Sequence, residues 1–415
     1  MRTKRIFASI RKMLSYGYIL LIVCELAGCG GASSAQSSHS TATPVPTPLL
    51  YILDQNGNLT SIRADGVQQW RHDFSSSWAG QGQFQVVDQT IYVASQSVTA
   101  LTTGGQQLWT QPLPDRTTAL DVRSGVIYVV AGRLLALNAR DGSLLWQDDL
   151  PVTGSPVSQL LLAPSSLLVA GGTTVAAYSL DGKPQWSTDL ATNNLGETGD
   201  QITALSLVDN VVIARARSMI AAVNIRTGQT IWTRESQVQA MALIQGVLYT
   251  MFIDVPDPTV NENAPIVTGL RAIQVGTGQQ LWQVTTSVNE SDTGLMTPNG
   301  LYQASATSLT AWDLSGKQRW SVPMITQITQ MIAQNNQIFA VAGQESELLS
   351  IDAQSGKQLW KQSEVEGSGN ELQVADHFLW QWDEVSGGVT GHYLQNGAVR
   401  WHIATDAIVQ MMVAS

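Results

Sequence analysis

Short apolar runs separated by turn sequences fill most of this chain. Residues 126–130 read VIYVV, residues 134–137 read LLAL, and residues 144–146 read LLW, with glycine-containing turns between them. Runs of this length that are rich in β-branched and aromatic residues are typical of β-strands joined in hairpins. Glycine tolerates the positive φ angles that tight turns require. The pattern therefore predicts antiparallel strands in this region.

The same order of runs and turns recurs along the chain, and each copy contains a glycine followed four residues later by a tryptophan. One further apolar run, such as residues 84–87 or 160–162, separates each tryptophan from the next copy. This gives four predicted strands in a unit of about 40 residues, which is the content of one β-propeller blade. The nine pairs are Gly66 and Trp70, Gly105 and Trp109, Gly142 and Trp146, Gly182 and Trp186, Gly228 and Trp232, Gly278 and Trp282, Gly316 and Trp320, Gly356 and Trp360, and Gly397 and Trp401.

A large ring at one fixed position on the last strand of every unit is expected to pack between blades. An indole N–H that becomes buried in this way also needs a hydrogen-bond acceptor. We therefore interpret the nine repeated tryptophans as structural blade-docking residues and not as ligand-stacking residues.

The repeat resembles the PQQ-like β-propeller repeat, with its apolar strand, its Thr-Gly turn and its Gly-x-x-x-Trp motif. The resemblance covers residues 49–415 and implies an all-β fold, a single propeller of four-stranded blades. Nine repeats are present, whereas members of this family most often have eight blades, so an eight-bladed ring is the alternative. The apolar run at 407–415 occupies the place of a first strand. It is expected to complete the N-terminal blade and so remove an exposed sheet edge.

The N-terminal segment is predicted to direct the protein out of the cytoplasm. Residues 1–28 combine five basic residues with a short apolar stretch, which is typical of a secretory signal. The sequence LAGC that ends at Cys29 resembles a bacterial lipobox, which implies a lipid on Cys29 and a membrane anchor. Residues 29–48 are rich in Ser, Thr and Pro and are expected to form a flexible tether. The predicted location of the propeller is the cell surface, or the periplasmic face of the outer membrane in a Gram-negative cell.

The charge of the chain argues against binding of nucleic acid. The whole chain carries a net charge of −10. Without residues 1–28 it holds 17 basic and 31 acidic side chains, a net charge of −14. Phosphate binding depends on clustered Lys and Arg, and the repeats contain no such cluster.

The candidate chemistry of the chain is sparse. Its two cysteines are Cys24, inside the signal, and Cys29, so the segment 49–415 has none for catalysis, a disulfide or zinc. No cofactor is expected. The family resemblance keeps PQQ held by calcium as the alternative, which would make the protein a PQQ-dependent dehydrogenase. The insertion at 252–265, with Asp254 and Asp257, is interpreted as a solvated loop or as a partner-binding loop.

Three tryptophans outside the repeat are candidate partner-binding residues. Trp380 and Trp382 alternate on one strand and so share a face. They form either a stacking platform for a sugar or peptide, or packing where the last blade meets the first. Trp78 lies on a predicted loop and is expected to be the more exposed ring.

These observations predict a non-enzymatic, monomeric scaffold that binds other envelope proteins. The repeat, the length and the lipobox are similar to those of the propeller lipoproteins of the outer-membrane β-barrel assembly machinery. The alternatives are the PQQ-dependent dehydrogenase and a surface carbohydrate-binding protein.

Overall fold

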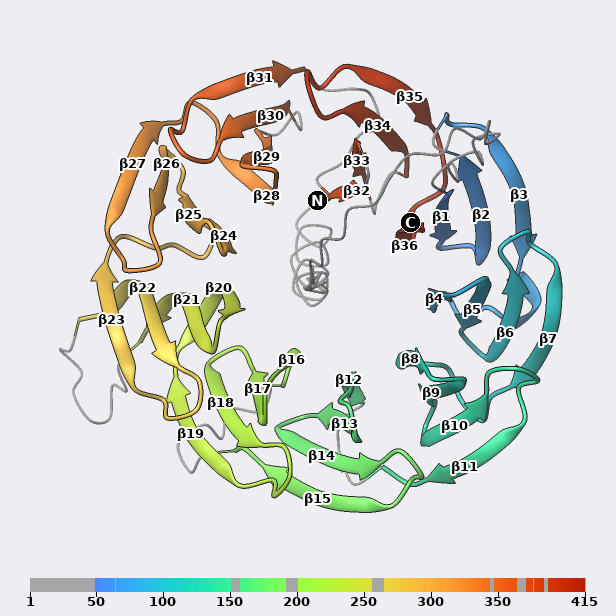
Figure 1. Cartoon of the computed structure of the whole chain (residues 1–415). Helices are drawn as coiled ribbons and strands as arrows, with labels where there is room; N and C mark the ends of the chain where they lie inside the picture. The colour runs from blue at the N-terminus through green and yellow to red at the C-terminus, as the bar shows by residue number, and fades with distance from the viewer. Residues whose placement is uncertain are drawn as a thin grey trace, which may run out of the picture. The chain divides into compact units, whose positions relative to one another are not determined.

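The structure is a computed structural model in which thirty-six strands form nine antiparallel sheets of four strands each, arranged as a ring (Figure 1). It describes residues 49–63, 65–150, 157–191, 201–255, 265–343, 347–363, 371–375, 377–383 and 387–414. In each blade the first strand lies at the centre of the ring and the fourth strand lies at the rim (Figure 1). The first strands of neighbouring blades approach one another around that centre.

The blades are numbered from the N-terminus, and the strands of each blade run in order from the centre to the rim. The first three blades are β36 (Ile408–Ala414), β1 (Leu49–Asp54), β2 (Asn58–Arg63) and β3 (Gln68–Asp73); β4 (Gln83–Val87), β5 (Thr90–Ala94), β6 (Ser97–Thr102) and β7 (Gln107–Pro112); and β8 (Ala119–Arg123), β9 (Val126–Val130), β10 (Leu134–Asn138) and β11 (Leu144–Asp148). A short 3-10 helix, η1 (Ser75–Ser77), follows the first blade.

Blades four to six are β12 (Val157–Leu162), β13 (Ser166–Gly171), β14 (Thr174–Ser179) and β15 (Pro184–Asp189); β16 (Ala204–Val208), β17 (Val211–Arg215), β18 (Met219–Asn224) and β19 (Thr230–Glu235); and β20 (Gln237–Ile244), β21 (Val247–Asp254), β22 (Val267–Gln274) and β23 (Gln280–Thr285). Blades seven to nine are β24 (Thr293–Thr297), β25 (Gly300–Ala304), β26 (Ser308–Trp312) and β27 (Gln318–Pro323); β28 (Ile328–Gln334), β29 (Gln337–Ala342), β30 (Glu347–Asp352) and β31 (Gln358–Gln362); and β32 (Glu371–Ala375), β33 (Phe378–Trp382), β34 (Val389–Tyr393) and β35 (Val399–Ile403).

The ring closes through the C-terminal strand. β36 pairs antiparallel with β1, with Leu50 opposite Val413 and Ile52 opposite Met411. The first blade is therefore built from both ends of the chain. The predictions of nine blades and of closure by the C-terminal strand are confirmed, and the eight-bladed alternative is wrong.

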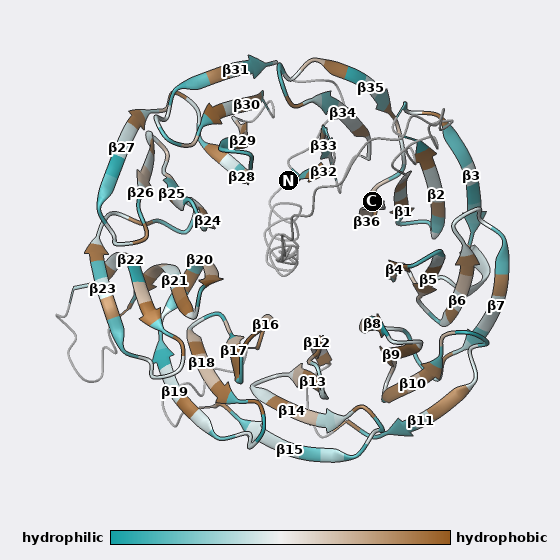
Figure 2. Cartoon of the chain, viewed as in Figure 1, coloured by the Kyte–Doolittle hydropathy of each residue, from teal (hydrophilic) through white to brown (hydrophobic). Residues whose placement is uncertain are grey.

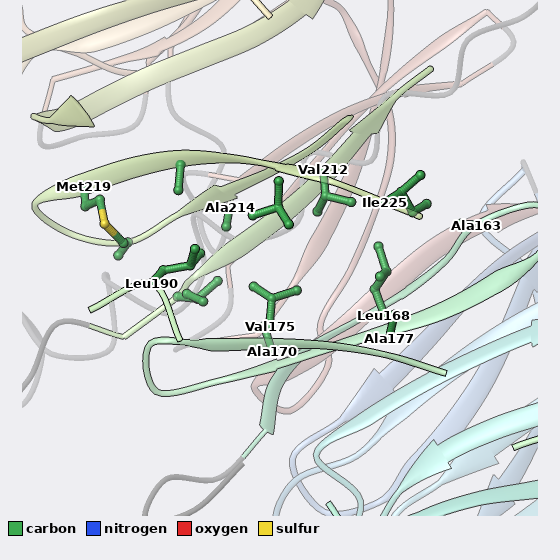
Figure 3. Close-up of a cluster of buried hydrophobic side chains, with 14 residues drawn as sticks. Ala163, Leu168, Ala170, Val175, Ala177, Leu190, Val212, Ala214, Met219 and Ile225 are labelled. Carbon is green, nitrogen blue, oxygen red and sulfur yellow. The ribbon is translucent and has the colours of Figure 1, made fainter. Parts of the chain in front are cut away.

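The hydrophobic core is divided into layers, one between each pair of blades. Figure 3 shows such a layer, in which Leu168 and Val175 of the fourth blade face Val212 and Ile225 of the fifth. The second and third strands are buried on both faces, which explains why they appear in the sequence as continuous apolar runs. The fourth strands carry mainly polar residues at the rim, although β11 is apolar (Figure 2).

Candidate functional site

Each repeated tryptophan lies on the fourth strand of its blade and covers the turn glycine of the next blade. A Cβ atom built on any of these nine glycines would lie 2.5–2.8 Å from the tryptophan ring of the preceding blade. Trp70 covers Gly105 in this way, and Trp401 of the ninth blade covers Gly66 of the first. All nine glycines have positive φ. The glycine–tryptophan motif therefore joins neighbouring blades and does not act within one blade.

The indole N–H groups are directed into the same turns. The N–H groups of Trp70, Trp109, Trp146, Trp186, Trp232, Trp282, Trp320 and Trp360 each donate a hydrogen bond of 2.7–3.3 Å to a backbone carbonyl of the following blade, as Trp146 does to Leu180. All nine rings are half-buried, and in these eight the indole N–H is satisfied by the protein. In this geometry the nine rings are occupied by contacts between blades.

A second part of the motif, not anticipated from the sequence, lies on the third strand. The residue opposite each tryptophan is always small, and the pairing register shifts directly after it. A small side chain leaves room for the indole, and the bulge turns the tryptophan toward the next blade. The signal in the sequence is a small residue nine or ten positions before each tryptophan: Ser61, Ala100, Ala136, Ala177, Ala222, Ala272, Ala311, Ser350 and Gly391.

Trp380 does not form an exposed stacking platform. Its side chain is 1% exposed, and its ring centroid lies 5.0 Å from that of Trp401. It occupies the second-strand position at which six other blades place a Tyr or Phe against their own tryptophan, as Tyr51 does against Trp70. The partner-binding prediction is therefore wrong for Trp380. Trp382 is half-buried against the same hydrophobic layer, which lies between the ninth and first blades.

Trp78 is also half-buried rather than free. Its ring lies against Gly57 and Gly82, and its Nε1–H donates to the carbonyl oxygen of Gln55 at 2.7 Å. In the connection between the first and second blades, Trp78 thus packs on Gly57, which has a positive φ. The repeated tryptophans pack on the turn glycines at the rim in the same way.

Asp254 lies at the end of β21 and forms an ion pair with Arg271 on β22. The Arg271 side chain is 1% exposed, and its guanidinium carbon lies 3.3 Å from the centroid of the Phe252 ring. Burial lowers the pKa of Arg271, and the Asp254 carboxylate offsets part of that effect. Asp254 therefore stabilises the sixth blade by pairing with Arg271 where the insertion begins. Asp257 and Cys29 lie outside the described residues.

His392 on β34 is a second enclosed titratable group, with 1% of its side chain exposed. Its Nδ1 lies 3.0 Å from the carbonyl oxygen of Gly397, and its Nε2 lies 3.1 Å from Oε1 of Gln381. Burial lowers the pKa of His392 below its ordinary value of 6.5, and the Gly397 contact partly opposes the shift.

The free energy of unfolding is expected to decrease as the pH falls below about 6.5, because the unfolded chain then binds a proton that buried His392 resists. The stabilisation from neutral His392 is present above pH 6.5 and is lost as the pH falls toward its lower folded pKa. Urea unfolding of the native chain and of His392→Gln between pH 5 and 8 measures this. The native chain should lose more stability on acidification; identical pH profiles would contradict the expectation.

Connections of variable length lie at one face of the ring. This face, called the long-loop face below, carries the connections between second and third strands and those between successive blades. They range from one residue, Ser236, to the segments 190–203 and 255–266. The opposite turn face carries only connections of two to five residues. The length of the connections is thus nearly uniform at the turn face and variable at the long-loop face.

A polar pocket of about 330 Å³ opens on the long-loop face between the sixth and seventh blades. Its walls come from the connection 286–292, from β25 and from the turn into β26. The connection is tied to the base of the insertion, because Thr268 donates to the carbonyl oxygen of Thr286 at 2.6 Å. The lining includes Thr286, Ser287, Asn289, Gln303, Ser305 and Thr307.

The described part of the chain holds no cluster of metal ligands, since no three His, Cys, Asp or Glu side chains lie close enough together there to hold one metal ion. The calcium that would hold PQQ therefore has no such ligand group in that part, and the absence of a cofactor stays a prediction. Among the same residues, no helix has the length and apolar character needed to span a bilayer.

The family model described as "Outer membrane protein assembly factor BamB" matches residues 55–253 and 268–409. The residues between these two matches, 254–267, overlap the insertion at 252–265 in the sixth blade. No protein of curated function matches the sequence.

Several solved structures match this chain at low sequence identity. BamB from Moraxella catarrhalis is 16% identical, with a TM-score of 0.49, over 76% of this chain and 92% of that one. The dihydro-heme d1 dehydrogenase NirN is 16% identical, with a TM-score of 0.55, over 91% and 77% of the two chains. A eukaryotic initiation factor is 12% identical, with a TM-score of 0.62, over 88% and 98%. At these identities the last two show a common fold alone.

Proposed function

This chain belongs to the family of the outer membrane protein assembly factor BamB, and we propose that it is a non-enzymatic scaffold that binds other proteins of the cell envelope. In this proposal the chain is exported by residues 1–28 and anchored to the membrane by a lipid on Cys29. The segment 29–48 then serves as the tether between the lipid and the propeller.

The observation that carries the proposal is the restriction of length variation to the long-loop face. Surface loops held on a rigid scaffold are where proteins concentrate binding residues. The turn face is constrained because its glycines receive the tryptophans of neighbouring blades. We infer that partners bind at the long-loop face.

Two buried titratable side chains, Arg271 and His392, serve the fold and not a reaction. Arg271 contacts Asp254 and Phe252, and His392 contacts Gln381 and Gly397, all within their own blades. A catalytic acid or base must reach the proton of a bound substrate. Both side chains are 1% exposed, so neither presents a reactive atom to solvent.

Site-specific photo-crosslinking in intact cells tests the proposal. Ile325, in the connection between the seventh and eighth blades, is fully exposed on the long-loop face. Gln89 is an exposed residue of the two-residue turn between β4 and β5, on the turn face, and is the matched control. A photoreactive amino acid at position 325 is expected to crosslink to a discrete envelope protein that also binds the purified chain. Position 89 is expected to yield no such product.

Equal crosslinking from both positions, or none from position 325 and neighbouring long-loop sites, would count against the proposal. Reconstitution with PQQ and calcium tests the alternative function, a PQQ-dependent dehydrogenase. Stoichiometric quinone uptake with alcohol- or sugar-dependent dye reduction would establish an enzyme instead of a scaffold.

A further inference from the structure

The pocket between the sixth and seventh blades has a carboxylate beside its wall that the protein only partly satisfies. Asp292 is 7% exposed, and its Oδ2 accepts a hydrogen bond of 3.0 Å from Nε2 of Gln303. Among the described residues, Oδ1 of Asp292 is buried without a hydrogen-bond partner. A buried carboxylate is costly unless its charge is compensated, so Asp292 favours a positive charge on the other side of the pocket wall.

Gln303 connects this carboxylate to the pocket. It lines the pocket itself, and its Nε2 also donates to the carbonyl oxygen of Ser287 at 2.6 Å. Both hydrogens of that amide nitrogen are thereby used. The backbone N–H of Asp292 donates to the carbonyl oxygen of Asn289, another lining residue, at 3.0 Å. The pocket wall and Asp292 thus form one hydrogen-bonded unit.

The surroundings of the pocket favour a cation. No lining residue is charged, and the hydroxyl and amide oxygens of the lining can accept hydrogen bonds. Glu290, on the same connection as Asp292, is exposed. Arg271, on β22 of the sixth blade, is paired with Asp254. The negative charge of Asp292, behind the Gln303 wall, would repel an anion in this pocket and attract an ammonium or guanidinium group.

The charges of the long-loop face agree with the chemistry of the pocket. Its described connections hold more acidic residues than arginines, whereas acidic and basic residues are nearly balanced in those of the turn face. The long-loop set is Asp115, Asp149, Glu290, Asp292, Asp383 and Asp406 against Arg116, Arg133 and Arg217.

We infer that this pocket is an anchor for a lysine or arginine side chain from a basic segment of a protein partner. This inference deepens the proposed function and rests on it. In this inference the cationic head lies against Gln303, in front of Asp292, and Ser305 and Thr307 line the same pocket. A volume of about 330 Å³ is at the lower end of the range for ligand pockets, about 300–1,000 Å³, and suits one side chain better than a large cofactor.

Binding of a tetralysine peptide to the full chain tests the inference, with the fully acetylated peptide and spermidine as comparison probes. Tetralysine is expected to bind, the acetylated peptide to bind at least tenfold more weakly, and Asp292→Asn to weaken tetralysine binding at least tenfold. Asp209→Asn changes an acidic residue of the turn face and should leave binding unchanged. Equal affinity of native and Asp292→Asn proteins, with both folded, would overturn the inference.

Thr307→Arg provides a variant that does not disturb the core. Thr307 is exposed at the pocket, so a guanidinium placed there should compete with the peptide and abolish pocket binding while leaving the melting temperature unchanged. Unchanged peptide binding in this variant would contradict the inference even if Asp292→Asn failed to fold. Tighter, Asp292-dependent binding of spermidine than of tetralysine would assign the site to a free polyamine and overturn the protein anchor.

Crosslinking separates failure of the pocket from failure of the scaffold. If position 325 captures its partner equally well with and without Thr307→Arg, the scaffold stands and the pocket inference falls. If position 325 and its neighbours capture nothing, the proposed function itself fails.

Discussion

Truncation of the chain after Asp406 is expected to open the ring and to leave little folded propeller at 37 °C. The truncation removes β36, whose Ile408 and Met411 are 4% and 9% exposed. Loss of two such side chains costs about 4–10 kcal/mol, at about 2–5 kcal/mol each. That is most of the ~5–15 kcal/mol that typically stabilises a protein.

The same truncation leaves β1 without its inner neighbour. β1 pairs with β36 from Leu49 to Asp54, so its loss exposes a row of unpaired backbone groups. It also removes Gln410, whose side-chain amide bonds both the N–H and the carbonyl oxygen of Phe84 in the second blade. Aggregation should therefore accompany the loss of stability.

Thermal unfolding followed by circular dichroism, together with size-exclusion chromatography with light scattering, measures both effects. A synthetic peptide of residues 407–415 added in trans should partly restore the melting temperature, because it can pair with β1. Ile325→Ser, at a fully exposed position, is the control and should melt as the native chain does. Native-like melting and a monomeric state after truncation would show that β36 does not hold the ring closed.

The second large effect is expected at the junction of Trp146 and Gly182, between the third and fourth blades. Trp146→Ala should cost about 3 kcal/mol, the lower end for a large aromatic residue, since its ring is only half-buried. Gly182→Ala should also be costly, because Gly182 has a φ of +87° and the new Cβ would lie 2.6 Å from Cδ2 of Trp146.

Gly125→Ala separates the cost of the positive φ from the cost of the steric overlap with Trp146. Gly125 has a φ of +77°, and a Cβ there would meet nothing within 4 Å. It should therefore cost only the ~1–2 kcal/mol of a left-handed alanine, whereas Gly182→Ala should cost roughly 1–3 kcal/mol more from the steric overlap.

A double-mutant cycle checks that the two residues act as one junction. In the Trp146→Ala background the overlap is gone, so Gly182→Ala should cost about as much as Gly125→Ala. Urea unfolding of the four proteins of the cycle gives the coupling energy. Additive effects would show that the tryptophan and the glycine stabilise the ring independently.

The repeat was readable from sequence because each blade obeys the same local rules. The turns need a residue with positive φ, which favours glycine, and the strands buried on both faces need apolar residues. Both requirements are therefore visible in the sequence of every copy. For Trp380 the sequence left two interpretations open, a stacking platform and packing where the last blade meets the first. Its alternation with Trp382 predicts a shared face but not its exposure, and the structure places Trp380 where other blades have Tyr51, Tyr92 or Phe339 in the core.

The contacts that decide closure and binding depend on residues far apart in the chain. Trp401 meets Gly66, and Gln410 meets Phe84, only because the ring brings its two ends together. Nine copies of the motif agree with eight or nine blades alike, and the nine four-stranded sheets, the first of them completed by β36 beside β1, decide the number.

By itself, the sequence determined the blade, its four strands and the position of its tryptophan, because these follow from local periodicity and turn chemistry. Only the tertiary structure decided that each tryptophan serves the following blade, that length variation is confined to one face, and that Asp292 and Gln303 meet beside a pocket. Those relations depend on how blades stack around the ring, and stacking brings together residues that no spacing along the chain links.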